Sequence, residues 1–179
     1  MFFTVALVLL QIVLGLFYGN LMEWTVHKYV LHHIGKKKGN AFNFHWFDHH
    51  RKSRLNKFQD DDYEQNIWNW NARGKEALGL GFLWLTHVWL FFFFPVFALT
   101  ITYCVINYYF THKWSHQNPE WAKKHLRWHW EHHMGKVQDA NYCVTQPWCD
   151  YLFRTRIHYR QEQTKSGKTK LVPVQGSIF

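Results

Sequence analysis

Histidine is the residue type with the clearest chemical potential in this 179-residue chain, which contains 14 histidines. Ten of them fall into four short boxes with the spacings H-x4-H, H-x3-HH, H-x3-H and H-x2-HH. These ten are His27, His32, His45, His49, His50, His112, His116, His129, His132 and His133. So many protonated imidazoles in one fold would repel one another, whereas a metal-bound imidazole is unprotonated at the ligating nitrogen. The boxes therefore predict metal ligation.

The spacing within the boxes indicates which histidines share one face of a helix. Residues three and four positions apart lie on the same face of an α-helix. His112 and His116 should therefore point together, and so should His45 and His49. The three histidines of the last box should also align, and His125 should extend their stripe by one turn.

The first box does not follow this rule, because His27 and His32 are five residues apart and do not align on a regular α-helix. Either the helix is distorted there, or the two histidines bind different metals. Glu23 lies one turn before His27 and is a candidate to orient its free ring nitrogen, as carboxylates do beside metal-bound histidines. Asp150 is a second candidate for such a role, and His33 is a candidate for an additional ligand.

The number of histidines indicates more than one metal. A single metal cannot use ten imidazoles, whereas two metals with about five ligands each would use them all. Nitrogen-only ligation suits iron, zinc, copper or nickel. An isolated H-x3-H pair is usually an ordinary pair of surface or core histidines, but four boxes that all adjoin apolar segments favour a shared metal site.

Two apolar segments must position these boxes. Residues 2–22 are almost wholly apolar and reach the ~20 residues that cross a membrane as a helix. Residues 77–110 contain no Lys, Arg, Asp or Glu and would be about 51 Å long as one helix, too long for a single ~30 Å crossing. Pro95 near their middle predicts a helical hairpin, because proline breaks or kinks a helix.

The basic residues predict the orientation of these segments. All 21 Lys and Arg residues lie between residues 28 and 75 or after residue 112. By the positive-inside rule, residues 23–75 and 111–160 form a cytoplasmic cap in two parts, and residues 161–179 form a polar tail of the same single domain. A hairpin returns the chain to the side that it left, so all four boxes can meet there.

The composition restricts the function classes. Hydrophobic residues make up 47% of the chain and charged residues 18%, which excludes a disordered or fibrous protein. The net charge is +9, and the basic residues flank the apolar segments. Anionic lipid headgroups are therefore the expected counter-charge, and nucleic acid is not. Asp60, Asp61 and Asp62 follow a basic stretch and are expected to form a solvated loop.

The box pattern resembles the membrane-bound non-haem di-iron oxygenases, and within them the fatty acid hydroxylase / sterol desaturase superfamily. The opening box also resembles that of the short bacterial carotenoid hydroxylases. Residues 141–144 (NYCV) and 150–155 (DYLFRT) are similar to the superfamily's closing segment N-[FY]-G-V…W-D-x-L-F-G-T. Cys143 and Arg154 stand where that pattern has glycine, so the backbone turns there are open to change.

The resemblance implies an all-α integral membrane fold, in which an N-terminal transmembrane helix and a helical hairpin carry a cytoplasmic helical cap with a dimetal site. It implies two iron ions, which zinc can replace in purified protein, and O2 as cosubstrate. The implied reaction is hydroxylation or desaturation of an apolar lipid-type substrate in a bacterial inner membrane. Electrons would come from a separate ferredoxin or cytochrome, for which Lys123, Lys124 and Arg127 offer a basic face, although these residues suit solvent or headgroups equally well.

Two other classes stay open at this point: a metal-handling membrane protein, and a membrane protein whose histidines bind zinc for stability. A metal carrier places its ligands inside the transmembrane segments, on the path of the ion. Of the 14 histidines, His87 is the one inside an apolar segment, and a hydrogen bond to a neighbouring helix is its expected role.

Overall fold

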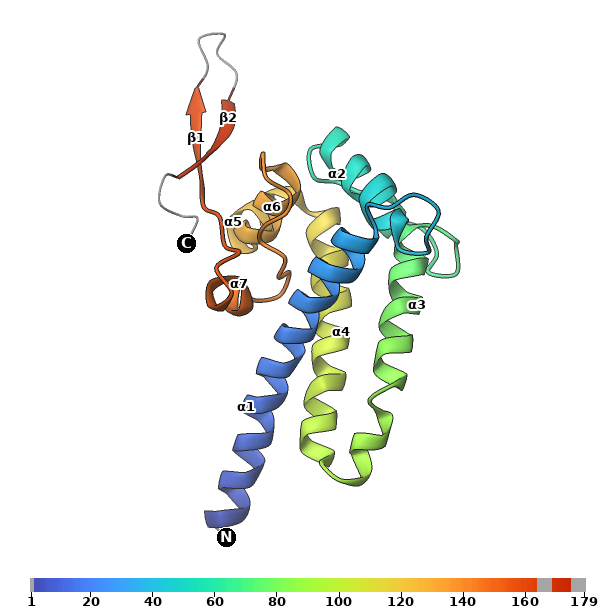
Figure 1. The fold of residues 1–179 in the computed structure, drawn as a ribbon, viewed down its shortest axis with the longest axis vertical. Coiled ribbons are helices and arrows are strands. Elements are labelled where there is room, and N and C mark those ends of the chain that lie inside the picture. Colours follow the sequence, from blue (N-terminus) through green and yellow to red (C-terminus); the bar gives the residue numbers. More distant parts are fainter. Residues whose placement is uncertain (1, 164–168, 175–179) are drawn as a thin grey trace.

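The computed structural model describes residues 2–163 and 169–174, and it is mostly helical (Figure 1). The elements in chain order are α1 (Phe2–Thr25), the π-helices η1 (Val26–Ile34) and η2 (His45–His50), α2 (Arg51–Leu55), the 3-10 helix η3 (Asp61–Glu64), α3 (Ala72–Leu85), the 3-10 helix η4 (Val88–Phe92), α4 (Pro95–Gln117), α5 (Pro119–His125), α6 (Arg127–Met134), α7 (Trp148–Leu152), β1 (Tyr159–Gln163) and β2 (Thr169–Pro173).

The helices α1, α3 and α4, together with the short 3-10 helix η4, form what we call the stalk. α3 descends, η4 turns the chain, and α4 returns beside α1 (Figure 1). Pro95 occupies the first position of α4, where its fixed φ suits a helix start and its missing N–H removes no hydrogen bond. α4 then continues past the apolar segment to Gln117, so the helix of the stalk itself carries His112 and His116 out of the stalk.

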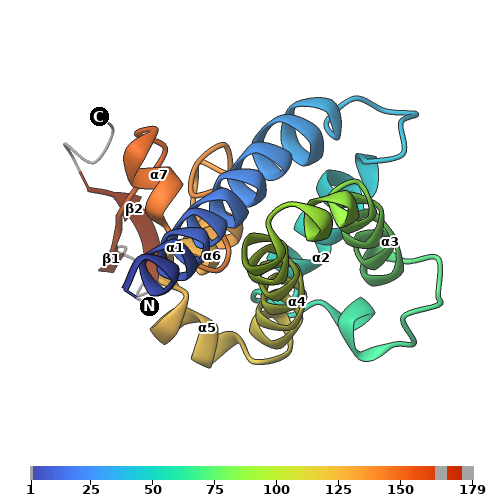
Figure 2. The ribbon, with the colours of Figure 1, turned by 90° about the horizontal axis from the view of Figure 1, so that it is seen from below.

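α1 packs closely on α4 and is inclined to α3 and α4, which Figure 2 shows nearly end-on. A Cβ atom on Gly15 would lie 2.7 Å from Cβ of Thr100, so only glycine allows this approach. Higher along α1, Tyr18 binds the ring of His87 through a 2.7 Å hydrogen bond to Nε2. The expected role of His87 as a hydrogen-bond partner between helices is therefore confirmed.

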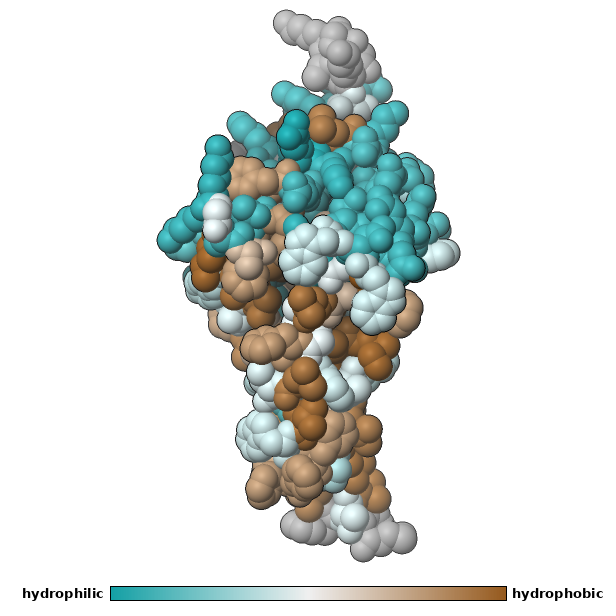
Figure 3. All heavy atoms as spheres, turned by 90° about the vertical axis from the view of Figure 1, so that its right-hand side faces the viewer, coloured by the Kyte–Doolittle hydropathy of each residue, from teal (hydrophilic) through white to brown (hydrophobic). Residues whose placement is uncertain are grey.

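The stalk presents apolar side chains outward. Phe82 is 70% exposed, Leu99 58% and Phe92 86%. Figure 3 shows hydrophobic residues over the lower part of the molecule and hydrophilic residues over the upper part. Within the described residues, one continuous helix, residues 4–34, is long and apolar enough to cross a membrane. α3 has 14 residues and falls short of that length by itself.

The remaining elements gather above the stalk, and we call them the cap. The chain enters the cap through η1 and leaves it after α2 and η3, then enters again at the top of α4 (Figure 1). α5 and α6 are separate helices, because Leu126 between them has a non-helical backbone with φ −122° and ψ 48°. Two segments far apart in the sequence, residues 26–64 and 112–163, thus lie side by side over the stalk.

The C-terminal region departs from the expected polar tail in an all-α fold. Strands β1 and β2 pair antiparallel, with Tyr159 opposite Pro173 and Gln163 opposite Thr169. Leu171 of β2 packs on a small buried cluster that includes Ile157 and Tyr159, which gives the strand pair an apolar attachment to the cap. The rest of the predicted tail, residues 164–168 and 175–179, lies outside the described residues.

Candidate metal centre

Nine of the ten box histidines form two groups in which the possible ligand atoms lie within 4.8 Å of one another. All nine are buried. The first group consists of His27, His32, His45, His50 and His132. The second group consists of His49, His112, His116 and His133. The tenth, His129, lies beside the second group, with its Nε2 atom 3.2 Å from Nε2 of His116. The two groups could each hold a metal ion.

Two π-helices explain which histidines of the first two boxes share a group. A π-helix closes its hydrogen bonds between residues five apart, so its wider turn brings such residues onto one face. His27 and His32 lie in η1 and meet in the first group, so the helix is distorted there and the two histidines do not belong to different groups. The expected pairing of His45 with His49 is wrong for the same reason, because η2 brings His45 together with His50 and directs His49 to the second group.

The last two boxes lie on regular α-helices. His112 and His116 are four residues apart on α4 and meet in the second group. On α6, by contrast, the expected common stripe is divided between the groups: His132 joins the first group, and its neighbour His133 joins the second.

The two groups adjoin because η2 and α6 each contribute to both. The rings of His50 and His133, which come from different groups, stack with their centroids 4.3 Å apart. The two groups are therefore neighbouring histidine sites that share η2 and α6.

In the first group, three Nδ1 atoms face oxygen atoms from the segment after α6. The ring of His27 binds the carbonyl oxygen of Tyr142, and His132 Nδ1 lies 2.6 Å from the carbonyl oxygen of Ala140. His32 Nδ1 lies 3.2 Å from Oδ1 of Asp139. Each of these oxygens can only accept, so each requires a proton on Nδ1 and leaves a lone pair on Nε2.

In the second group, the Nδ1 atoms face two carboxylates and a carbonyl. His49 Nδ1 lies 2.7 Å from Oδ2 of Asp60, and His112 Nδ1 lies 2.5 Å from Oε1 of Glu76. His116 Nδ1 donates to the carbonyl oxygen of Phe58 over 2.8 Å. Such partners fix the ring orientation and the tautomer of a metal-bound histidine.

The surroundings of the Nε2 atoms, on the other side of each ring, indicate that the groups suit a metal. His32 and His132 both hold their proton on Nδ1, yet their Nε2 atoms lie only 3.2 Å apart. Two lone pairs at that distance cannot make a hydrogen bond, and a cation between them would turn the repulsion into ligation. In the second group, Nε2 of His49, His112 and His133 is buried without a hydrogen-bond partner among the described residues. The donor set therefore fits metal ions bound through Nε2.

Burial keeps these imidazoles neutral. It lowers the pKa of His45, His50, His132 and His133 well below the usual value, and the neighbouring histidines lower it further. Burial raises the pKa of Asp60, but the hydrogen bond from His49 and the other polar contacts of the carboxylate outweigh it, so the pKa stays below the ordinary value. Neutral imidazoles beside ionised carboxylates are the protonation states that metal binding requires.

Four predicted site residues lie outside these contacts. His33 is exposed on η1. His125 is exposed as well, and its ring stacks on Trp121, because the break at Leu126 removes it from the face of α6. The expected continuation of the α6 stripe through His125 is therefore wrong.

Glu23 and Asp150 do not contact a histidine of either group, and both bind the backbone of residues 142–145 instead. The carboxylate of Glu23 accepts hydrogen bonds from the backbone of Val144 and Thr145. Asp150 accepts from the backbone N–H groups of Tyr142 and Cys143 over 2.9 and 2.8 Å. The two carboxylates thus hold in place the segment whose Tyr142 carbonyl binds His27. They support this histidine through the backbone and not, as predicted, by direct contact with a histidine ring.

The sequence reasoning missed the carboxylates that do contact the ring nitrogens, which are Asp60, Glu76 and Asp139. The expected solvated loop at residues 60–62 is wrong for Asp60 and Asp62, both of which are buried. A signal existed for Glu76, which is the last acidic residue before the long apolar segment that leads to His112. At the second replaced glycine of the closing segment, Arg154 adopts φ 57°, so the turn that glycine favours persists without it.

No family model, curated protein or solved structure matches this chain.

Proposed function

We propose that this protein is an integral-membrane di-iron oxygenase of the fatty acid hydroxylase / sterol desaturase type. It would use O2 and external electrons to hydroxylate or desaturate a C–H bond of an apolar, lipid-type substrate. The observation that carries the proposal is the pair of adjoining, buried, all-histidine groups above an apolar stalk.

The number and type of the ligands support iron over a structural zinc site. Structural zinc sites are almost always four-coordinate. The first group offers five imidazole nitrogens, and with His129 the second group has five histidines as well. Imidazole also suits iron, which is the metal that oxygen chemistry on an unactivated C–H bond requires.

The stalk supports insertion in a membrane by three crossings. The helix of residues 4–34 is long enough by itself, and the exposed apolar side chains of α3, η4 and α4 extend the apolar surface around it. In the proposed topology the N-terminus and Pro95 lie away from the cytosol. The cap, where the Lys and Arg residues are concentrated, lies on the cytoplasmic side.

Each part of the chain would have a distinct task in the reaction. Two iron ions bound at the histidine groups would activate O2 for a C–H oxidation that no side chain can perform. The Nε2 atoms of the two groups would hold the ions, and the oxygens facing Nδ1 would orient the rings. The burial of both groups excludes bulk water, and the stalk offers an apolar route for a substrate from the bilayer.

The direct test is iron-dependent oxygen consumption. The full chain is purified in detergent, loaded with ferrous iron and supplied with a chemical reductant and lipid extract. We expect two iron ions per chain, O2 consumption, and a lipid whose mass changes by the gain of one oxygen atom or the loss of two hydrogen atoms. His112→Ala should abolish this turnover, whereas His125→Ala, which alters an exposed histidine, should retain it.

The second candidate is a metal-stabilised or metal-handling membrane protein without oxygenase activity. The complete burial of the histidines favours it, because structural metal sites are closed. Tightly bound zinc, no O2 consumption after iron loading, and unfolding on chelation would establish this reading and overturn the oxygenase proposal.

A further inference from the structure

We infer that electrons enter the metal centre through Trp46, and that the adjoining face of η2 and α2 docks an acidic, one-electron carrier protein. This inference rests on the proposed oxygenase function, because the electron balance of that reaction requires a reductant. For each O2, two electrons delivered singly and two protons would accompany insertion of one oxygen atom into a C–H bond, and the other oxygen atom would leave as water. The carrier is oxidised by one electron at each encounter.

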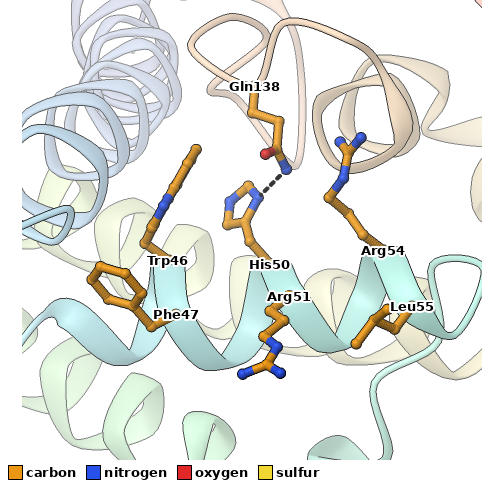
Figure 4. A pocket seen from close by; sticks show the side chains of 7 residues that line it. All are labelled: Trp46, Phe47, His50, Arg51, Arg54, Leu55 and Gln138. Carbon is orange, nitrogen blue, oxygen red and sulfur yellow. Dashed lines mark hydrogen bonds between the residues drawn. The ribbon is translucent and has the colours of Figure 1, made fainter.

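A surface pocket of about 350 Å³ lies directly over one histidine of the centre. Figure 4 shows His50 between Trp46 and Gln138, with Arg51 and Arg54 further along the same helical segment. The amide nitrogen of Gln138 donates a hydrogen bond to Nδ1 of His50 over 2.9 Å. His50 therefore has one edge toward the pocket and its other edge toward the metal centre.

His50 contacts both groups of histidines. Its Nε2 atom lies 3.1 Å from Nε2 of His32 and 3.2 Å from Nε2 of His132. Its ring also stacks on His133 of the second group. An electron that reaches the ring of His50 is therefore adjacent to histidines of both groups.

Trp46 connects this histidine with the surface. Its ring lies 5.2 Å from the ring of His50 and 5.3 Å from that of His32, measured between centroids. Trp46 is half-buried, so part of the indole reaches the pocket. A polarisable aromatic side chain in contact with two ligand rings and with solvent is a direct route into an otherwise closed centre.

The other aromatic rings that contact the two groups, within the described part of the chain, do not offer such a route. Phe44, Phe58, Tyr63 and Tyr142 are buried. Tyr108, which contacts His112, lies on α4 within the apolar segment that the proposed function places in the membrane, out of reach of a soluble partner. Among these rings, Trp46 is therefore the one in the cap that is half-buried and can connect the histidines with a soluble partner.

The charges around the pocket select the partner. Arg51 and Arg54 are exposed and line it, and the ammonium group of Lys36 lies 4.3 Å above the ring of Trp46. Asp139, which pairs with Lys36, is the acidic residue in contact with this set. The cationic rim fits an acidic protein surface, since complementary charge steers association.

The basic face expected from the sequence has no comparable connection to the centre. Lys123 lies over Trp130, and Arg127 pairs with Glu131. Within the described residues, the ring of Trp130 contacts none of the histidines of the two groups. A carrier bound there would lack an aromatic contact with the ligands.

The experiment measures reduction of the iron-loaded, oxidised full chain by stopped-flow absorbance, without O2. The probes are a reduced [2Fe–2S] ferredoxin, which is acidic, and reduced methyl viologen, a small cationic reductant. Trp46→Leu should slow reduction by both reductants several-fold, because the centre is otherwise closed, while Trp46→Phe should restore much of the rate. Arg51→Glu should slow reduction by ferredoxin about tenfold at low salt and less at high salt.

Lys124→Glu is the matched control, because it reverses an exposed charge on the other basic face. Normal ferredoxin rates in both Trp46→Leu and Arg51→Glu would overturn the inference, and slowing by Lys124→Glu alone would move docking to α5 and α6. If Arg51→Glu reduced binding to vesicles of phosphatidylglycerol but not the ferredoxin rate, the face would be a headgroup site and the inference would fail. Failure of the oxygenase proposal is distinguishable, since viologen-reduced protein would then consume no O2.

Discussion

Nδ1 of His49 and Oδ2 of Asp60 form a 2.7 Å hydrogen bond in which both side chains are fully buried. Glu76, whose side chain is 10% exposed, forms the corresponding contact with His112, so two carboxylates that are largely shielded from solvent support the second histidine group. The first group has no equivalent among the described residues, because its carboxylate partner, Asp139, is half exposed. The second group therefore has the more negative surroundings and should bind a divalent cation more tightly.

The buried carboxylate leads to a prediction about metal affinity. Asp60→Asn removes the negative charge that supports His49 while nearly preserving the shape of the side chain. We expect affinity at one of the two sites to fall about 10- to 100-fold, as for other partners of metal-bound histidines. The measurement is titration with zinc or ferrous iron against a chelator of known affinity. Asp61→Asn, an exposed neighbour, should leave both sites intact, and equal losses in the two variants would contradict the assignment.

The division of neighbouring histidines by η1 leads to a second prediction. His32 points into the first group, whereas His33, the next residue, is exposed. His32→Ala should reduce the metal content of folded protein from two ions toward one per chain, and His33→Ala should retain two. Elemental analysis of monodisperse protein distinguishes them. Identical metal content in the two variants would show that η1 does not orient His32 as a ligand.

The pKa shifts predict how the metal-free protein responds to acid. The buried histidines such as His45 and His132 have a pKa well below 6.5, the value in an unfolded chain. Below about pH 6.5 the unfolded chain binds protons that the folded chain does not, so the free energy of unfolding falls as the pH falls. Each such histidine contributes about 1.4 kcal/mol per pH unit in that range and nothing above it.

The measurement for this prediction is the thermal midpoint of the metal-free protein in detergent between pH 8 and pH 5. We expect a plateau above pH 7 and a steep decrease below about pH 6.5. Bound metal should shift the decrease to lower pH, because protons must then displace the ion. A midpoint independent of pH for the metal-free chain would be inconsistent with neutral, buried imidazoles.

The contact between α1 and α4 leads to a prediction about stability. A Cβ on Gly15 would lie 2.7 Å from Cβ of Thr100, and neither helix can move away without losing its packing. Gly15→Ala should destabilise the protein by about 1–3 kcal/mol through overpacking. Gly79→Ala is the matched control on α3, where an added Cβ meets nothing within 4 Å. It should be neutral or stabilising by up to about 1 kcal/mol.

The thermal midpoints of these two glycine variants in the same detergent, compared with the parent protein, test the packing of the stalk. If Gly15→Ala were as stable as Gly79→Ala, α1 would not lie against α4 at Thr100. The result does not depend on the metal, so it examines the stalk separately from the histidine groups.

Residue type and local spacing determined much of this protein. The identity of the ten box histidines, the apolar segments and the reversal near Pro95 are properties of short stretches, because imidazole chemistry, apolarity and the missing N–H of proline do not depend on distant residues. The pairing of His112 with His116 also followed, since α4 is a regular α-helix.

Tertiary structure decided how those histidines are shared and supported. A one-residue change in helical hydrogen bonding moves His49 away from His45, and the i, i+4 rule contains no information about where a π-helix replaces an α-helix. The partners of the ring nitrogens are equally non-local, since Asp139 lies 107 positions from His32 and Glu76 lies 36 from His112. These contacts exist only because the stalk returns the chain to its starting side and the cap closes around unpaired lone pairs, which must find acceptors or cations when they are buried.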